Sequence, residues 1–312
     1  MRRIKDVARA ALPENPWTIL RKVRRDVARY IDLHAARKAL LRSDALSDDE
    51  KYLLRNASLR VQANDDMYLP GTGRHYLSIG ISSNRAINSV LAHAPHQVRT
   101  ILDLPSGYGR FLRFLKARFP HATIWACDIQ PEAVEFCRRA FDVEAVVSNK
   151  DFAKVSLPGL FDLIWSGSLL THLDECRATD LLRLYHRSLA PSGLCVFTMH
   201  GRTSAAWLDS HTETYGLTEA SRLKVLSELD KRGYGYADYQ PGSAYGISIA
   251  RRARIVEMAS AAGNWTFSCF FESAWSDHHD VYGFTKGPTK APLIVEARAP
   301  VPTVSNVFRW IL

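Results

Sequence analysis

One stretch decides the fold of this 312-residue chain: Ile101-Leu102-Asp103-Leu104-Pro105-Ser106-Gly107-Tyr108-Gly109-Arg110. The apolar run at 99–104 predicts a buried strand, and the turn residues at 105–109 predict a loop that leads into a helix at 110–118. Gly107 and Gly109 let the backbone turn tightly and approach a ligand closely. The stretch therefore predicts a strand, a glycine loop and a helix whose N-terminal amides can hold a polar group.

The alternation of strand and helix continues along the chain. After the strand at 99–104 we expect strands at 122–127, 144–147, 161–165, 193–199, 265–271 and 281–285 and helices at 83–94, 131–141, 176–189 and 249–262. The tail contains one further strand candidate, at 293–297. Such alternation is typical of a parallel sheet with helices on both faces. The predicted class is α/β, with a Rossmann-like, mostly parallel sheet of seven strands.

Three segments flank or interrupt this pattern. Residues 1–70 are expected to form a basic helical extension, 71–290 the main domain and 291–312 a tail. Within the main domain, 201–250 read as an insertion at the carboxyl edge of the sheet, where such folds bind ligands, with one helical stretch at 218–231.

The positive charge of the chain is concentrated at one end. Residues 1–42 hold 12 Lys/Arg and 4 Asp/Glu, so 12 − 4 = +8 of the net +9 lies there, on an amphipathic helix expected over 16–42. This pattern favours docking on anionic lipid or on a partner enzyme, and the alternative is a solvated helix packed on the domain. With no CxxC pair among five cysteines and no segment long and apolar enough to span a membrane, we expect a cytoplasmic protein, either free or peripheral to the inner face of the membrane.

Two acids narrow the choice of cofactor. Asp128 follows the second strand, nineteen residues after Gly109, where a carboxylate can accept hydrogen bonds from ribose hydroxyls. A dinucleotide site prefers G-x-G-x-x-G, but Leu112 occupies the third glycine position and Asp103 would repel a pyrophosphate. Asp103 suits an ammonium group instead. S-adenosylmethionine, which has an amino-acid end, a sulfonium and a ribose, matches both acids, and an NAD-binding oxidoreductase is disfavoured.

Asp103–Gly109 resembles the first motif of the class I methyltransferases, D/E-x-G-x-G-x-G, with Pro105 in place of the first glycine. Because proline has no N–H, one backbone contact of that motif is missing here. The resemblance extends over 97–200, and the later alternation extends it to about residue 286. It implies an S-adenosylmethionine-dependent enzyme whose cofactor-binding residues are Tyr76, Gly80, Asp103, Pro105, Gly107, Gly109, Asp128, Ile129, Asp151, Phe152 and Ser166.

The catalytic residues carry a weaker signal. His172, just past the fourth strand, is our first candidate for a base or substrate contact, and the alternative is a capping or core histidine. His279 and Asp280 are the second candidates, and the alternative is a solvated polar turn. Together with His200 they offer metal ligands, but no spacing demands a metal and we expect none.

The acceptor is expected to be a glycan or another hydroxylated small molecule. Tyrosines in the insertion either stack on such a substrate or pack the insertion onto the domain. The stretch from Tyr245 to Val281 resembles bacterial methyltransferases associated with surface-polysaccharide assembly. The alternatives are a small-molecule N-methyltransferase and a non-catalytic module that binds the cofactor. Nucleic acid is not expected as a partner, because the basic residues lie on one helix and no base-flipping tetrapeptide follows the fourth strand.

Overall fold

The computed structural model describes residues 16–94, 97–286 and 292–296. The chain divides into two compact units, residues 1–77 and 78–312. The division falls within helix α4 (Gly73–His93), which begins ten residues before the helix predicted at 83–94. The glycine loop and both acids belong to the second unit.

The first unit contains helices α2 (Pro16–Leu41) and α3 (Asp48–Asn56), so the helix predicted at 16–42 is confirmed. Buried residues of α2 recur on one face, at Leu33, Ala36 and Leu40. Asp32 stabilises the unit from the same helix, because its carboxylate accepts a hydrogen bond from the Tyr68 hydroxyl at 2.5 Å and from the Gly73 amide at 3.0 Å.

The second unit is built on one large sheet. Its strands, in chain order, are β1 (Thr100–Asp103), β2 (Thr123–Asp128), β3 (Glu144–Val147), β4 (Phe161–Ser166), β5 (Leu189–His200), β8 (Thr266–Trp275), β9 (His279–Thr285) and β10 (Leu293–Val295). They are arranged in the order β10-β8-β9-β5-β4-β1-β2-β3, and β9 alone runs antiparallel to both of its neighbours. The mostly parallel α/β sheet is confirmed, with eight strands among the described residues because β10 joins its edge.

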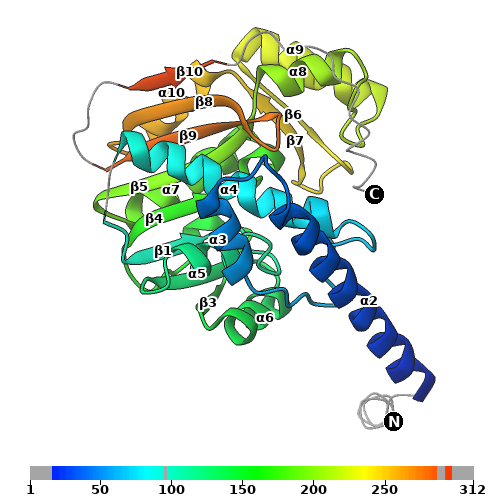
Figure 1. Cartoon of the computed structure of the whole chain (residues 1–312). Helices are drawn as coiled ribbons and strands as arrows, with labels where there is room; N and C mark the ends of the chain where they lie inside the picture. Colours follow the sequence, from blue (N-terminus) through cyan, green and yellow to red (C-terminus); the bar gives the residue numbers. More distant parts are fainter. Residues whose placement is uncertain (1–15, 95–96, 287–291, 297–312) are drawn as a thin grey trace, which may run out of the picture. The chain divides into compact units, whose positions relative to one another are not determined.

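Helices cover both faces of this sheet (Figure 1). On one face lie the second-unit part of α4, α5 (Leu112–Arg118) and α6 (Pro131–Phe141), and on the other lie α7 (Glu175–Ser188) and α10 (Arg252–Ala262). The main core fills the α7 and α10 side, where Leu102, Leu104 and Cys127 belong to one buried cluster with apolar residues of both helices. This packing fixes the strand ends from which the site is built.

The insertion at 201–250 forms a small layer of its own, made of α8 (Arg202–Asp209), α9 (Glu219–Arg232) and the hairpin of β6 (Tyr234–Asp238) and β7 (Gly246–Ala250) (Figure 1). The helical stretch predicted at 218–231 is confirmed. The helix predicted at 249–262 is wrong in its first residues, because Ile247 and Ile249 alternate along β7 into the core of the insertion. Strand β7 packs against the short helix η2 (Leu170–His172) and the end of β5, so the insertion lies at the carboxyl edge of the sheet.

Candidate functional site

The glycine loop leaves β1 where the order of the sheet reverses, between β2 and β4. In such sheets ligands bind outside the carboxyl ends of the strands at this point. Gly107 and Gly109 have φ of +49° and +76°, in the region that favours glycine. A Cβ on Gly107 would meet no atom within 4 Å, whereas one on Gly109 would collide with Phe141 at 2.4 Å. Gly107 thus borders open space, and Gly109 lets the loop pack on α6.

The loop is held by hydrogen bonds to β2. The Ser106 amide donates to the Cys127 carbonyl at 2.9 Å, and the Gly107 amide donates to the Asp128 carboxylate at 2.8 Å. Asp128 also accepts from the Gln130 amide at 3.0 Å. Pro105 contributes no N–H, so the loop presents fewer donors than a loop with glycine there. These bonds set the loop and the end of β2 as one rigid edge.

Asp103, at the end of β1, is a buried carboxyl with an unpartnered atom. It is 2% exposed, and its Oδ2 has no hydrogen-bond partner among the described residues. Burial raises the pKa of Asp103 well above its ordinary value, and the nearby charge of Asp128 raises it further. A buried carboxylate is costly unless a cation pairs with it. The site therefore fits a ligand that brings a positively charged group to Asp103.

Two further residues beside this edge differ in exposure. Ile129, directly after Asp128, is 46% exposed although it is a large apolar residue. Ser166, at the end of β4, is fully buried. Its hydroxyl lies 2.7 Å from the Tyr185 hydroxyl, which in turn lies 3.2 Å from the Leu104 carbonyl oxygen. Tyr185 of α7 thus ties the ends of β1 and β4 together, a role that its place on an apolar helix face did not reveal.

Residues 151 and 152, after β3, already have partners within the chain. Asp151 caps the short helix η1 (Phe152–Lys154) by accepting from the Ala153 amide at 3.0 Å, and it pairs with Lys154 at 3.1 Å. The Lys154 ammonium lowers the pKa of Asp151, with help from the Ala153 amide. Phe152 is buried in the main core. The structure therefore places Asp151 at the surface and the Phe152 ring inside.

The two candidates on α4 are packing residues in their own units. In the first unit, the Tyr76 ring is buried against Tyr68 and its hydroxyl donates to Asp65 at 2.7 Å. In the second unit, the Phe114 ring occupies the space beside Gly80, because a Cβ there would lie 2.1 Å from it. Gly80 thus allows α4 to approach α5 closely.

His172, in η2, faces the insertion. Its Nδ1 donates to the Gly246 carbonyl at 2.8 Å, because a carbonyl oxygen only accepts. The Tyr245 ring stacks on it at 4.7 Å, and the Tyr239 ring lies 6.0 Å away. Burial lowers the pKa of His172, so the neutral imidazole predominates at neutral pH with Nε2 as its acceptor.

Four of the five tyrosines of the insertion form two pairs. Tyr239 and Tyr245 surround His172, and Tyr245 remains 48% exposed. Tyr234 is buried and donates to the Leu173 carbonyl at 2.8 Å, while Tyr236 donates to Asp238. The first pair offers aromatic surface beside the histidine, and the second pair holds the insertion in place.

Three buried histidines meet where β5 ends and β9 begins: His200, His278 and His279. The antiparallel register pairs His200 with His279, with ring centroids 4.5 Å apart, and His278 lies 4.2 Å from His279. Burial lowers the pKa of all three, to about 4 for His278. The charges of His278, His200 and His172 lower the pKa of His279 further.

Asp280 is separated from these histidines. Successive side chains on a strand point to opposite faces, so Asp280 faces away from His279. It is buried, accepts from the Ser273 amide at 3.0 Å and lies against Gly201, where a Cβ would come within 1.8 Å of its carboxylate. Burial raises the pKa of Asp280 to about 7. The structure thus places His279 beside His200 and His278 in a buried cluster, and not in the solvated polar turn that was the alternative. His278 was not among our candidate residues.

A comparison with known protein families finds a match in the middle of the chain. Residues 101–193 match a family described as a methyltransferase domain. No curated protein matches the chain. The matched segment runs from β1 into β5, so it contains the glycine loop, both acids and His172.

Three solved structures are among those similar to this chain. An S-adenosylmethionine-dependent methyltransferase from Clostridium acetobutylicum is 12% identical, with 66% of this chain and 92% of that chain covered and a TM-score of 0.47. A TehB-like S-adenosylmethionine-dependent methyltransferase from Corynebacterium glutamicum is 19% identical, with coverage of 66% and 88% and a TM-score of 0.42. An O-methyltransferase family protein from Burkholderia thailandensis is 15% identical, with coverage of 70% and 58% and a TM-score of 0.46.

Proposed function

We propose, on the premise that the chain is a class I S-adenosylmethionine-dependent methyltransferase, that it methylates a hydroxyl group of a sugar or of another hydroxylated small molecule. The observation that carries this proposal is His172. Its Nδ1 is engaged by the Gly246 carbonyl, so the neutral ring presents Nε2 as a proton acceptor at the carboxyl edge of the sheet. An alcohol needs such a base as it attacks, whereas an unprotonated amine does not.

The residues after β1 and β2 hold the cofactor in this proposal. When bound, S-adenosylmethionine supplies a methyl group on a positively charged sulfonium. Asp103 would pair with the ammonium of its amino-acid end, which would give the buried Oδ2 the cationic partner that it lacks among the described residues. Asp128 accepts hydrogen bonds from the ribose, and the exposed Ile129 side chain lies against the adenine. Gly107 leaves the loop surface open for this contact.

The rings around His172 hold the acceptor. Tyr245 presents an exposed aromatic face that suits the apolar face of a sugar ring, and Tyr239 lies beside it. Stacking there brings a hydroxyl of the acceptor to His172 Nε2. Most of the rate then comes from alignment of the attacking oxygen with the methyl group, and proton removal by His172 adds to it.

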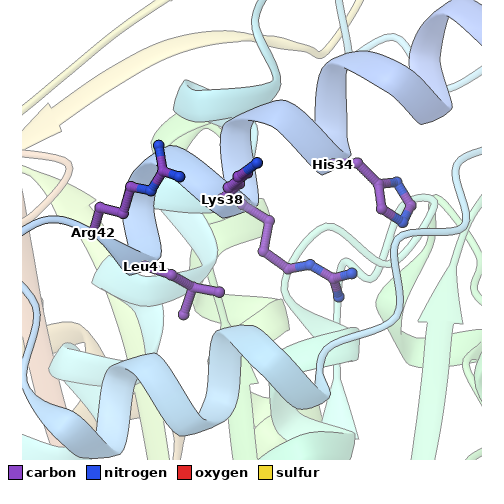
Figure 2. Close-up of a pocket in the computed structure, with 5 residues that line it drawn as sticks. His34, Lys38, Leu41 and Arg42 are labelled. Atoms are coloured by element: carbon purple, nitrogen blue, oxygen red, sulfur yellow. The ribbon is translucent and has the colours of Figure 1, made fainter.

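Helix α2 has a separate role: we propose that it attaches a cytoplasmic enzyme to an anionic membrane surface. A basic pocket at the end of this helix is lined by His34, Arg37, Lys38, Leu41 and Arg42, four of which are labelled in Figure 2. Large apolar side chains are exposed on the same helix, namely Val27, Tyr30 and Ile31. Basic and apolar residues side by side are typical of a helix that lies in the membrane interface. None of the described helices combines the length and apolar character needed to cross a membrane.

The first experiment is a calorimetric titration of the purified chain with S-adenosylhomocysteine, with NAD alongside. We expect binding of the first and none of the second. An acceptor screen with isotope-labelled S-adenosylmethionine follows, starting from glycans and hydroxylated small molecules. Mass spectrometry and NMR of the product then locate the label. A methyl ether supports the proposal, and a label on nitrogen would exclude O-methylation. Tight cofactor binding with no turnover on any acceptor would favour a non-catalytic module.

A further inference from the structure

The histidine cluster has a geometry that the proposed function does not use. His200 ends β5, His279 begins β9 opposite it, and His278 precedes β9. One ring nitrogen of each lies within 4.8 Å of those of the other two. A tetrahedral metal with bonds of about 2.1 Å needs such nitrogens about 3.4 Å apart. A bound metal would therefore hold the three nitrogens closer together than the 4.8 Å limit within which they lie here.

Each ring of the cluster is oriented by a partner on its Nδ1. His200 Nδ1 donates to the Ser248 carbonyl at 3.1 Å, and His278 Nδ1 donates to the Ser276 carbonyl at 2.6 Å. His279 Nδ1 lies 3.4 Å from the Thr198 hydroxyl. Histidines that bind metals nearly always donate their second ring nitrogen in this way, which fixes the tautomer and the ring orientation. The pattern assigns Nε2 as the ligand atom of all three.

The surroundings of the cluster define the kind of ion. Aromatic rings enclose it: Trp207 stacks on His278, Tyr215 lies 4.8 Å from His200, and Trp275 meets His279 edge-on. Two acids adjoin these histidines in the sequence: Asp277 is exposed, and Asp280 is bonded to the Ser273 amide on the other side of the sheet. Neutral imidazoles without a carboxylate suit zinc and similar transition metals, whereas magnesium and calcium require oxygen ligands.

We propose that His200, His278 and His279 bind one divalent transition-metal ion, with zinc the best fit. Three histidine ligands leave at least one coordination position for water or for an oxygen of another molecule, as in catalytic zinc sites. Strand β7 packs against both the end of β5 and η2, so the cluster and His172 lie at the same carboxyl edge of the sheet. Use of the ion to hold an acceptor hydroxyl rests on the proposed function, but binding of the ion does not.

The test measures metal binding without cofactor or acceptor. The tag-free chain is treated with a chelator, dialysed and titrated with Co²⁺, whose visible absorption reports three-histidine coordination, and then with Zn²⁺ in competition. We expect one equivalent of each and no competition from excess Mg²⁺. Zinc should also raise the melting temperature of the chain in a concentration-dependent manner, because a ligand that binds only the folded state stabilises it.

Variants then locate the ion. We expect His200→Asn, His278→Asn and His279→Asn each to weaken Co²⁺ binding by about 100-fold or more, since outer-shell changes alone cost about 10- to 100-fold. His121→Asn, at an exposed position, should bind Co²⁺ as the parent does. Circular dichroism confirms the fold of each variant, and the thermal shift of the parent chain provides a test that needs no variant. A folded parent chain that takes up neither ion, or uptake that all three variants leave unchanged, would overturn the proposal while leaving the methyltransferase assignment intact.

Discussion

We call the edge with Asp103, the glycine loop and Asp128 the cofactor side of the proposed site, and the edge with His172, His200, His278 and His279 the histidine side. The two sides differ in which parts of the chain form them. Asp103, the glycine loop and Asp128 come from two consecutive strand ends and the loop between them. His172 comes from η2, His200 from the end of β5 and His279 from the start of β9, which runs in the opposite direction to β5. One side is a local motif, and the other exists only after the whole sheet has formed.

The two sides also differ in charge. On the cofactor side, two carboxyl groups are buried close together, and Asp103 has an unpartnered oxygen among the described residues. On the other side the buried groups are imidazoles, and burial favours their neutral form. The difference fits the two proposals above, in which the cofactor side binds a cationic cofactor and the histidine side accepts a proton or a metal ion. Substitutions on one side should therefore leave the function of the other unchanged.

The largest effect is expected from His172→Gln, which removes the proposed base and leaves the cofactor side intact. Loss of a general base costs about 10²- to 10⁴-fold in rate, so kcat should fall by this amount. The Kd of S-adenosylhomocysteine should not change. Steady-state kinetics and calorimetry measure the two quantities, with the exposed His121→Gln as the control. Full activity in the His172 variant would remove this residue from the reaction.

Asp128→Asn tests the opposite side. The substitution keeps an oxygen acceptor for the Gly107 amide but removes the charge that we propose binds the ribose. A hydrogen bond to a charged group contributes about 1.5–3 kcal/mol, so the Kd of S-adenosylhomocysteine should rise about 10- to 100-fold. Calorimetry checks this, with the exposed Asp142→Asn at the end of α6 as the matched control. Unchanged affinity would exclude Asp128 from the site.

Asp103→Asn should stabilise the ligand-free chain against unfolding and weaken the binding of the cofactor. In the unfolded chain an aspartate has a pKa of about 3.9. In the folded chain burial raises the pKa of Asp103 well above this value, and the charge of Asp128 raises it further. Asp103 therefore destabilises the fold increasingly as the pH rises from about 4 towards its folded pKa. The variant should melt higher than the parent at pH 8, by about 2–4 °C for each kcal/mol recovered, and less so at pH 5. The same gain at both pH values would mean that the charge is not the cause.

The smallest effect concerns neither side of the sheet. Lys38 is an exposed residue of the basic pocket on α2, and a lysine near an anionic membrane contributes about 1 kcal/mol to binding. Lys38→Ser should lower cosedimentation with vesicles of phosphatidylglycerol and phosphatidylcholine about fivefold, while kcat and cofactor affinity stay constant. No binding of the parent chain to these vesicles would leave a partner protein as the target of the helix.

The cofactor side could be predicted from the sequence because its signals are local. A strand, two glycines and an acid at the end of each of two strands follow one another within residues 101–128, and each has its meaning without tertiary contacts. The partners of these residues could not be predicted in the same way. The sequence does not predict the hydrogen bond between the Tyr185 and Ser166 hydroxyls. The direction of a polar atom on a buried helix face is fixed only when the helix packs on the sheet.

The histidine side could not be predicted without knowledge of the order of the strands in the sheet. The pattern at 281–285 predicts a strand, but neither its partner nor its direction follows from the alternation of side chains. Only the antiparallel position of β9 beside β5 brings His279 to His200 and turns Asp280 away. The hairpin of β6 and β7 was missed for a related reason. Its apolar residues, such as Ile247 and Ile249, are few and run into the helical pattern of α10.

The insertion of β9 between β5 and β8 also sets the order in which a ribosome can complete the protein. His279 emerges 79 residues after His200 (279 − 200 = 79), which takes about 4–16 s at about 5–20 residues per second. During that interval the cofactor half is fully synthesised, while the edge of β5 that will receive β9 stays unpaired. An unpaired strand edge is a template for association with other chains. Expression at low temperature, or with chaperones that bind nascent chains, should therefore raise the yield of soluble protein by protecting this edge until β9 arrives.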